Sequence, residues 1–187
     1  SYLAKADLVT KMVIEFTELQ GTMGKIYAKA SGEDQRVANA IEEQYKPKSA
    51  NDDLPESMVG IVLSLADKMD SIVGLYAIEK YVTGSQDPFA LRRAALGLIN
   101  IILANNINVD LKALVNDALI VYTEKNGLPF DYDQTMQKTL DFIKDRLKNM
   151  LIDEGYRYDV VNAVINTSDS NILKICLLYT SPSPRDS

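Results

Sequence analysis

The sequence predicts an all-α fold, and three observations support this prediction. Apolar residues recur at spacings of three and four along most of the 187 residues, which is typical of amphipathic helices. Glycine, proline and asparagine stand at several of the breaks between these segments. No stretch of useful length alternates apolar and polar residues, so no strand pattern competes with the helical one.

The first expected helix covers residues 8–19 and is followed by two further helices. One broad face of it carries Leu8, Val9, Met12, Val13, Phe16 and Leu19, and Gly21 and Gly24 are expected to mark its end. A second helix is expected over residues 33–45, ending before Pro47. A polar loop then leads through Pro55 to a long, strongly apolar helix over residues 56–78.

The next helix raises a question, because two arginines stand among its first residues. Asp87 is expected to cap its free N–H groups, with Pro88 at the first helical position. At 100° per residue Arg92 lies on the face of the later apolar residues, whereas Arg93 points about 100° away. A cation that opens an apolar stripe needs a carboxylate or a phosphate as its partner.

After a break at residues 105–110, three more helices are expected over residues 111–125, 134–153 and 159–166. The chain begins in helical pattern without an initiator methionine, so we expect it to be an internal piece of a longer protein. Residues 175–187 change character abruptly and look like read-through into an adapter or vector sequence. A disordered native tail is the alternative explanation for them.

The composition excludes several classes of function. The formal net charge of −6 argues against a free-standing nucleic-acid binder, although a local basic patch in a larger assembly stays open. The chain has no histidine, which excludes Ser–His, Cys–His and His-ligated metal chemistry. The only cysteine, Cys176, cannot form an internal disulfide, and a reducing cytosol is the plain inference. No apolar run approaches the length that a membrane span needs.

Asp67 and Asp70 form the most notable carboxylate pair, three residues apart on one helix face. Gly60 and Gly74 lie near that face, which suggests that another backbone approaches closely there. One interpretation makes the pair a metal site or a general acid/base pair. The interpretation favoured by the absence of histidine is a structural ion pair with Arg92 on the following helix.

The basic residues form three groups, and none has the pattern of a nucleotide-binding loop or a zinc site. Lys46 and Lys48 flank Pro47, and Arg92 is followed by Arg93. The third group is interleaved with acids and is expected to be mostly a solvated face: Lys144, Arg146, Lys148 and, further on, Arg157. Tyrosines on either side of Arg157 would either stack on RNA bases or anchor a helix start.

Four long segments together resemble the β subunit of the bacterial two-subunit glycyl-tRNA synthetase (the tetrameric α2β2 glycine–tRNA ligase). They are ADLVTKMVIEFTELQGTMG, AIEEQYKPKSANDDLP, LADKMDSIVGLY and GSQDPFALRRAALGLI, and the later KTLDFIKDRLKNMLIDEGYRYDVVNAVI fits the segment that follows in that family. The resemblance covers nearly all of residues 1–174, and these correspond to a central-to-late part of a much larger subunit.

The resemblance implies a function for the whole enzyme and a supporting role for this chain. The family ligates glycine to tRNA(Gly) with ATP and Mg²⁺ in the cytoplasm, with the catalytic core in the α subunit and tRNA-holding domains in the β subunit. The implied partners are therefore the α subunit and tRNA(Gly), with no DNA and no membrane. This fragment is expected to be non-catalytic and to bind neither metal nor cofactor. The alternative is a free-standing, non-catalytic helical scaffold or RNA-binding module.

The resemblance also implies a domain plan. Residues 1–105 would form a helical domain related to HD-type phosphohydrolases, residues 106–174 a helical body segment, and residues 175–187 a non-native tail. An active phosphohydrolase would lack its histidine ligands, so the domain would be a metal-free relic in which Asp67 or Asp70 keeps the family's carboxylate position and Asp7 or nearby polar groups face it. The candidates for contact with tRNA are Lys46, Lys48, Arg93 and Arg157.

Overall fold

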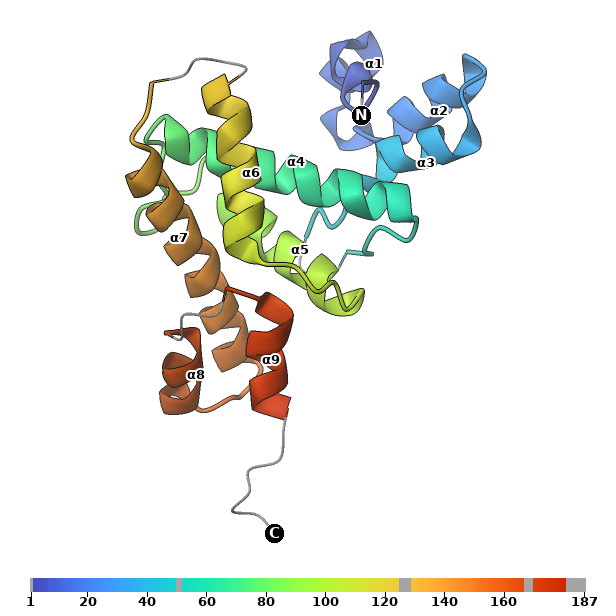
Figure 1. Ribbon diagram of the computed structural model, residues 1–187. Coiled ribbons are helices and arrows are strands. Elements are labelled where there is room, and N and C mark those ends of the chain that lie inside the picture. The colour runs from blue at the N-terminus through green and yellow to red at the C-terminus, as the bar shows by residue number, and fades with distance from the viewer. Residues whose placement is uncertain (1, 50–51, 125–128, 167–169, 181–187) are drawn as a thin grey trace. The chain divides into compact units, whose positions relative to one another are not determined.

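The structure is a computed structural model that describes residues 2–49, 52–124, 129–166 and 170–180. Within these ranges the regular elements are helices, together with two isolated bridges, Thr83–Gln86 and Asp110–Asn171, that belong to no strand. The all-α prediction is therefore confirmed (Figure 1). No helix in the described ranges combines the length and the hydropathy that crossing a membrane would require.

The chain divides into two compact units, residues 1–68 and residues 69–187. The division falls inside one long helix, α4 (Met58–Ala77), whose first half belongs to unit 1 and whose second half belongs to unit 2. The boundary expected after residue 105 lies instead within unit 2, just beyond a helix. The HD-like label for residues 1–105 stays a prediction.

The expected helix over residues 8–19 is wrong, because the chain there forms three short pieces: η1 (Ala6–Val9), α1 (Lys11–Glu15) and η2 (Thr17–Leu19). Thr10 is extended, and its side chain accepts a hydrogen bond from the Val13 N–H, so it starts a new helix rather than continuing the first. Phe16 leaves helical geometry in turn, with φ −125° and ψ 80°. Local capping therefore overrides the apolar periodicity of this segment.

Unit 1 continues with α2 (Thr22–Ala30) and α3 (Gln35–Glu43), which pack against each other around Ala28, Ala38 and Ile41. Helix α3 confirms the expected helix over residues 33–45. Gly24 does not end a helix as expected but lies inside α2. A Cβ at Gly24 would stand 2.6 Å from the Ile41 side chain and 3.0 Å from the carboxyl carbon of Asp7, so this glycine permits close packing.

The two glycines of α4 also serve close packing, but side chains rather than a backbone approach them. The side chain of Glu43 occupies the space that a Cβ on Gly60 would need, within unit 1. The ring of Tyr122 does the same at Gly74, within unit 2. The expected close approach to the glycines near Asp67 and Asp70 is thus confirmed, but the approaching groups are side chains and not another backbone.

Unit 2 is built around the long helix α7 (Tyr132–Asp153) (Figure 1). Helix α7 packs against α5 (Leu91–Ala104), α6 (Leu111–Glu124) and α8 (Tyr158–Ile165). The helices expected over residues 111–125, 134–153 and 159–166 therefore correspond to α6, α7 and α8. The core of unit 2 consists of fully buried aliphatic side chains, among them Ile72, Leu98, Ile99, Ile102, Leu119, Ile143 and Leu147.

Helix α5 begins three residues later than expected, at Leu91 rather than Pro88. The residue before it, Ala90, has φ +55°, which separates Pro88 from the helix. Asp87 nevertheless caps the helix, because its carboxylate accepts hydrogen bonds from the N–H groups of Leu91, at 2.8 Å, and Arg92, at 3.0 Å. The expected capping residue is correct, although the expected first turn is not.

A ninth α-helix in the described ranges, α9 (Ile172–Thr180), was not expected from the sequence. It packs against α5 and α8, and Ile172 and Ile175 are each only 1% exposed. Packed structure thus continues past residue 174, into the segment expected to be a non-native tail. The non-native origin of residues 175–187 stays a prediction, and residues 181–187 lie outside the described residues.

Candidate functional site

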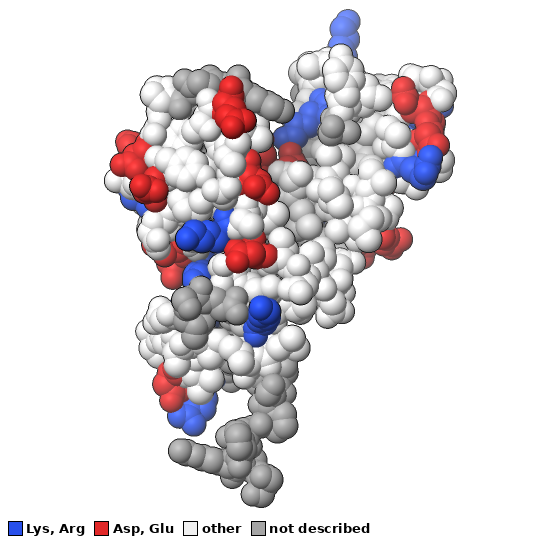
Figure 2. All heavy atoms as spheres, in the orientation of Figure 1, with Lys and Arg blue, Asp and Glu red and all other residues white. Residues whose placement is uncertain are grey.

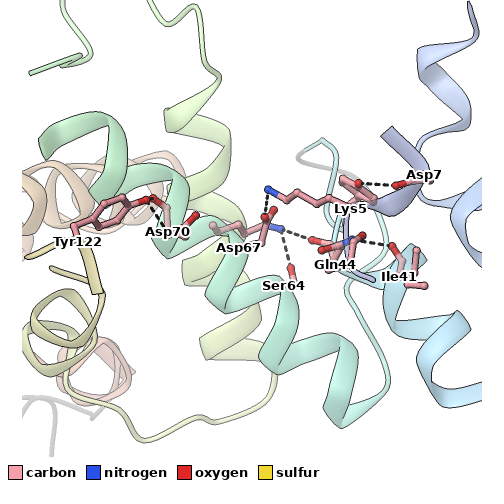
Figure 3. A network of polar contacts seen from close by, with 11 residues as sticks. Lys5, Asp7, Ile41, Gln44, Ser64, Asp67, Asp70 and Tyr122 are labelled. Atoms are coloured by element: carbon pink, nitrogen blue, oxygen red, sulfur yellow. Dashed lines mark hydrogen bonds and ion pairs between the residues drawn. The ribbon is translucent and has the colours of Figure 1, made fainter. Parts of the chain in front are cut away.

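Asp7 is the most deeply buried carboxylate of unit 1, at 2% exposure, and it lies at the start of a polar network (Figure 3). One carboxylate oxygen accepts the Gly21 N–H at 2.6 Å, and the other accepts the Tyr45 hydroxyl at 3.2 Å. Burial, with the nearby charge of Asp7, raises the pKa of Tyr45 to about 12, so its hydroxyl stays protonated and donates at neutral pH. Asp7 therefore ties η1 to the start of α2 and to the end of α3.

Asp67 and Asp70 do not share a site, although they stand three residues apart on α4 (Figure 3). The Asp67 carboxylate forms an ion pair with Lys5 at 2.5 Å, within unit 1. The Asp70 carboxylate accepts the Tyr122 hydroxyl at 2.8 Å, within unit 2. Burial, together with this hydrogen bond, raises the pKa of Tyr122 well above its usual range, so Tyr122 acts as a donor.

The expected ion pair of Arg92 with Asp67 or Asp70 is replaced by different contacts. The Arg92 guanidinium donates to the carbonyl oxygen of Gly84, in the turn before α5. The physical reason is a rotation of the helix: Leu91, not Arg92, opens the buried face, which continues through Ala95 and Leu98. Arg92 is consequently half-buried at the edge of that face and reaches back to the preceding turn.

A buried amine, Lys68, joins the segment after α3 to α4. Its Nζ donates to the carbonyl oxygens of Gln44, at 3.4 Å, and Lys46, at 2.8 Å, and lies 2.8 Å from the Ser64 hydroxyl. Burial lowers the pKa of Lys68 to about 8. Because Ser64 is itself fully buried, this Ser–Lys pair has no access to a substrate, and Lys68 instead satisfies two carbonyl oxygens of the segment that follows α3.

Asp7 and Asp67 therefore act as acceptors for donors within unit 1. Asp7 and Asp67 are both near Tyr45, as the charge effects on that phenol show, yet each has its own donor. Among the described residues no group of three or more carboxylate, cysteine or histidine side chains is arranged to hold a metal ion. The expected position of Asp7 opposite a retained carboxylate stays a prediction.

The candidates for tRNA contact lie in both units. In unit 1, Lys46 is half-buried with its Nζ 3.9 Å from Asp53, and Lys48 is exposed and donates to the carbonyl oxygen of Gln20 at 3.0 Å. Both lie on the loop after α3. Lys46 also offers its carbonyl oxygen to Lys68, so this residue has a structural role in addition to its charge.

In unit 2, Arg93 and Arg157 are both exposed. Arg93 lies in the first turn of α5. Because it follows Arg92 in the same helix, its side chain points about 100° away from that of Arg92, as expected. Arg157 precedes α8 and forms an ion pair with Asp159 at 2.6 Å. The neighbouring Tyr158 is exposed, with the Lys148 amine 4.9 Å from its ring centre, rather than anchored in the core.

A hollow of about 570 Å³ opens between the turn before α5 and the face of α7, and we call it the α7 hollow. Three cations line it: Arg92, Lys138 and Arg146. Tyr81 is the half-exposed ring of its wall, and behind it lie the buried rings of Tyr76, 5.2 Å from Tyr81, and Phe142, 5.3 Å from Tyr76, measured between ring centres. The hollow therefore combines positive charge with aromatic surface.

Sequence reasoning missed this hollow and treated Arg146 as part of a solvated face. The signal was present on α7, where Lys138, Phe142 and Arg146 recur at spacings of four and therefore share one side of the helix. Their partners Tyr76 and Tyr81 come from a segment some sixty residues earlier, which periodicity on α7 alone could not reveal.

The charged groups are dispersed on the face of the molecule drawn in Figure 2. Lysine and arginine side chains there alternate with aspartates and glutamates, and uncharged residues cover most of the surface between them. This distribution agrees with the net charge of −6. No broad basic area is visible among the described residues on the face drawn there.

Comparison with known proteins identifies the family of the chain. The family model described as "Glycyl-tRNA synthetase beta subunit" matches residues 1–166. Among curated proteins, the chain is similar to the glycine–tRNA ligase beta subunit of Clostridioides difficile (strain 630), with 49% identity over 170 residues, 91% of this chain and 24% of that protein.

Two further relatives carry the same name. The beta subunit of Desulforamulus reducens is 50% identical over 173 residues, 92% of this chain and 25% of that protein. The beta subunit of Escherichia coli O1:K1 / APEC is 44% identical over 163 residues, 87% of this chain and 23% of that protein. The chain thus spans about a quarter of the length of these relatives. With a family model that matches most of its residues and relatives of this similarity, the chain belongs to the glycyl-tRNA synthetase beta subunit family.

Proposed function

We propose that this chain is a piece of the β subunit of glycine–tRNA ligase and helps to hold tRNA(Gly) during ATP-dependent glycylation. The observation that carries the proposal is the family match over residues 1–166. In this proposal the α subunit is the partner of the β subunit, ATP and Mg²⁺ are used at the catalytic centre in the α subunit, and the assembly works in the cytoplasm.

The proposal gives this segment a supporting role without catalytic residues. Its buried carboxylate Asp7 and its buried amine Lys68 are each bound to groups of unit 1, and Asp70 is bound to Tyr122 of unit 2. These side chains fix helix ends and helix pairs, which suits a domain that contributes its shape and its surface. Contacts with tRNA would come from Lys46, Lys48, Arg93 and Arg157, because cations reach phosphates by charge without sequence information.

The test is glycylation by the full-length β subunit that contains this segment, combined with the α subunit. We expect Arg93→Gln and Arg157→Gln to raise KM for tRNA(Gly) severalfold at low salt, by a factor that shrinks as the salt concentration rises, and to leave KM for glycine and ATP unchanged. Arg36→Gln is a matched control for Arg157, because Arg36 is an equally exposed arginine paired with an aspartate two residues away. If the α subunit bound tRNA(Gly) equally well with and without the full-length β subunit, the proposed function would be refuted.

A further inference from the structure

The α7 hollow holds more positive charge than the surrounding protein neutralises. Among the described residues, neither Arg92, Lys138 nor Arg146 lies within ion-pair distance of a carboxylate. Arg92 donates to the Gly84 carbonyl oxygen, and Lys138 donates to the Gln134 side-chain oxygen at 3.3 Å. These neutral acceptors orient the two cations but leave their charge available.

Arg146 is fixed in the wall of the hollow, with its Nε buried, so a ligand would meet its two Nη groups. Its Nε is inaccessible to solvent and has no hydrogen-bond partner among the described residues. The guanidinium carbon lies 5.9 Å from the Phe142 ring centre, so the aromatic wall holds the group in place without satisfying that N–H.

The charge balance of the hollow suits a single anionic group. Three cations face two carboxylates, Asp141 and Asp145, so the lining carries one net positive charge. Both carboxylates are exposed, and Asp141 is occupied as an acceptor by the Gln137 amide at 2.8 Å. Several consecutive phosphates would be repelled by these carboxylates, whereas one phosphate beside the arginines would avoid most of this repulsion.

The half-exposed ring of Tyr81, beside three cations, favours a nucleic acid over an acidic side chain as the occupant. Lys138 lies 4.0 Å from the centre of the Tyr81 ring, so cation and ring form one surface. Stacking rings beside arginines bind single-stranded or unpaired nucleotides, because every base offers a flat face and every linkage a phosphate. An arginine fork matches the two free oxygens of a phosphodiester.

We propose that the α7 hollow binds one phosphodiester of tRNA, held by Arg92, Lys138 and Arg146, with the adjacent nucleotide against Tyr81. The proposal rests on the proposed function, since it names the part of the tRNA-holding surface that takes a phosphate. It adds three residues that were not among the tRNA-contact candidates.

The proposal is tested in the assembled enzyme, with full-length β and α subunits and tRNA(Gly). Lys138→Gln and Arg146→Gln should each raise KM for tRNA about fivefold to tenfold, the loss expected for one charge-assisted hydrogen bond, while KM for ATP and glycine stays unchanged. Each variant should also reduce the salt slope of tRNA binding by about 0.7–0.9. Arg146→Lys should restore the salt slope but only part of the affinity, because an ammonium group lacks the arginine fork.

Lys112→Gln is the matched control, because Lys112 is an exposed lysine of the same unit that lies outside the hollow. Melting temperatures of all variants should equal that of the unaltered β subunit. Unchanged KM for tRNA and salt slope in Lys138→Gln and Arg146→Gln would overturn the proposal and leave the proposed function standing. Weaker binding of the α subunit with unchanged tRNA affinity would also overturn it, since the occupant would then be a protein carboxylate.

Discussion

Replacing Asp7 by alanine should destabilise unit 1 more than any exposed acid of that unit. The carboxylate is 2% exposed and accepts two hydrogen bonds, from the Gly21 N–H at 2.6 Å and from the Tyr45 hydroxyl at 3.2 Å. In Asp7→Ala the Gly21 N–H loses its acceptor, and water reaches it poorly because Gly21 is itself buried.

The magnitude follows from these two bonds. A hydrogen bond to a charged acceptor is worth about 1.5–3 kcal/mol, and the half-buried Tyr45 can turn toward solvent, so most of the loss arises at Gly21. We expect Asp7→Ala to lower the free energy of unfolding by about 3 kcal/mol, and Asp7→Asn by about 1–2 kcal/mol because an amide oxygen still accepts the Gly21 N–H. A double change with Tyr45→Phe should lose less than the sum of the single changes.

The assay is urea unfolding followed by circular dichroism at the helical band. Asp34→Ala is the control, because Asp34 is an exposed acid that caps α3 through the Arg36 N–H, and its loss should cost about 0.5–1 kcal/mol. Equal losses for Asp7→Ala and Asp34→Ala would refute the reasoning, since the Asp7 carboxylate would then be stabilised no better than a surface group.

Three other perturbations test other parts of the structure. Ile175→Ala should destabilise unit 2 by about 2–4 kcal/mol in thermal or urea unfolding. Leu178→Ala is the control and should change the free energy of unfolding little, because the Leu178 side chain is 57% exposed. Equal effects of the two substitutions would mean that α9 is not packed. Gly74→Ala should destabilise unit 2 because its Cβ meets the Tyr122 ring, and much of the loss should vanish in a Tyr122→Ala background, as a double-mutant cycle would show. Burial lowers the pKa of Lys68 to about 8, so above pH 8 the unfolded chain binds more protons than the folded chain. The free energy of unfolding should therefore rise between pH 8 and pH 10 by up to about 1.4 kcal/mol per pH unit. A Lys68→Met variant with the same pH profile would contradict this.

The sequence predicted the fold well wherever helices are long and cap signals agree with periodicity. Residues 111–124, 132–153 and 158–165 form helices close to the expected bounds, and α3 lies within its expected segment. The failure at residues 8–19 has a local cause, because Thr10 caps a new helix in the middle of an apolar pattern that fits one continuous helix equally well. Periodicity alone cannot detect such a break.

The candidate site was less predictable, because it depends on rotations of helices and on partners distant in the chain. Arg92 was placed on the buried face from the residues that follow it, yet Leu91 starts that face, and the error amounts to one residue, or 100°. Asp67 and Asp70 were taken as one pair because of their spacing, whereas their donors come from different units. The spacing of the α7 cations can be read from the sequence. The tyrosines that line the hollow with them, Tyr76 and Tyr81, are some sixty residues away in the chain, so the hollow itself could not be predicted.

The number of residues between the two halves of helix α4 determines which side chains are buried in each unit. Ser64, Lys68, Ile72 and Tyr76 follow one another at spacings of four and are all buried, so a single helix face supplies polar contacts in unit 1 and apolar contacts in unit 2. Inserting or deleting one codon between Lys68 and Ile72 would turn the later residues about 100° off that face without changing any side chain. We therefore expect point substitutions in this stretch to be tolerated more readily than single-codon insertions or deletions.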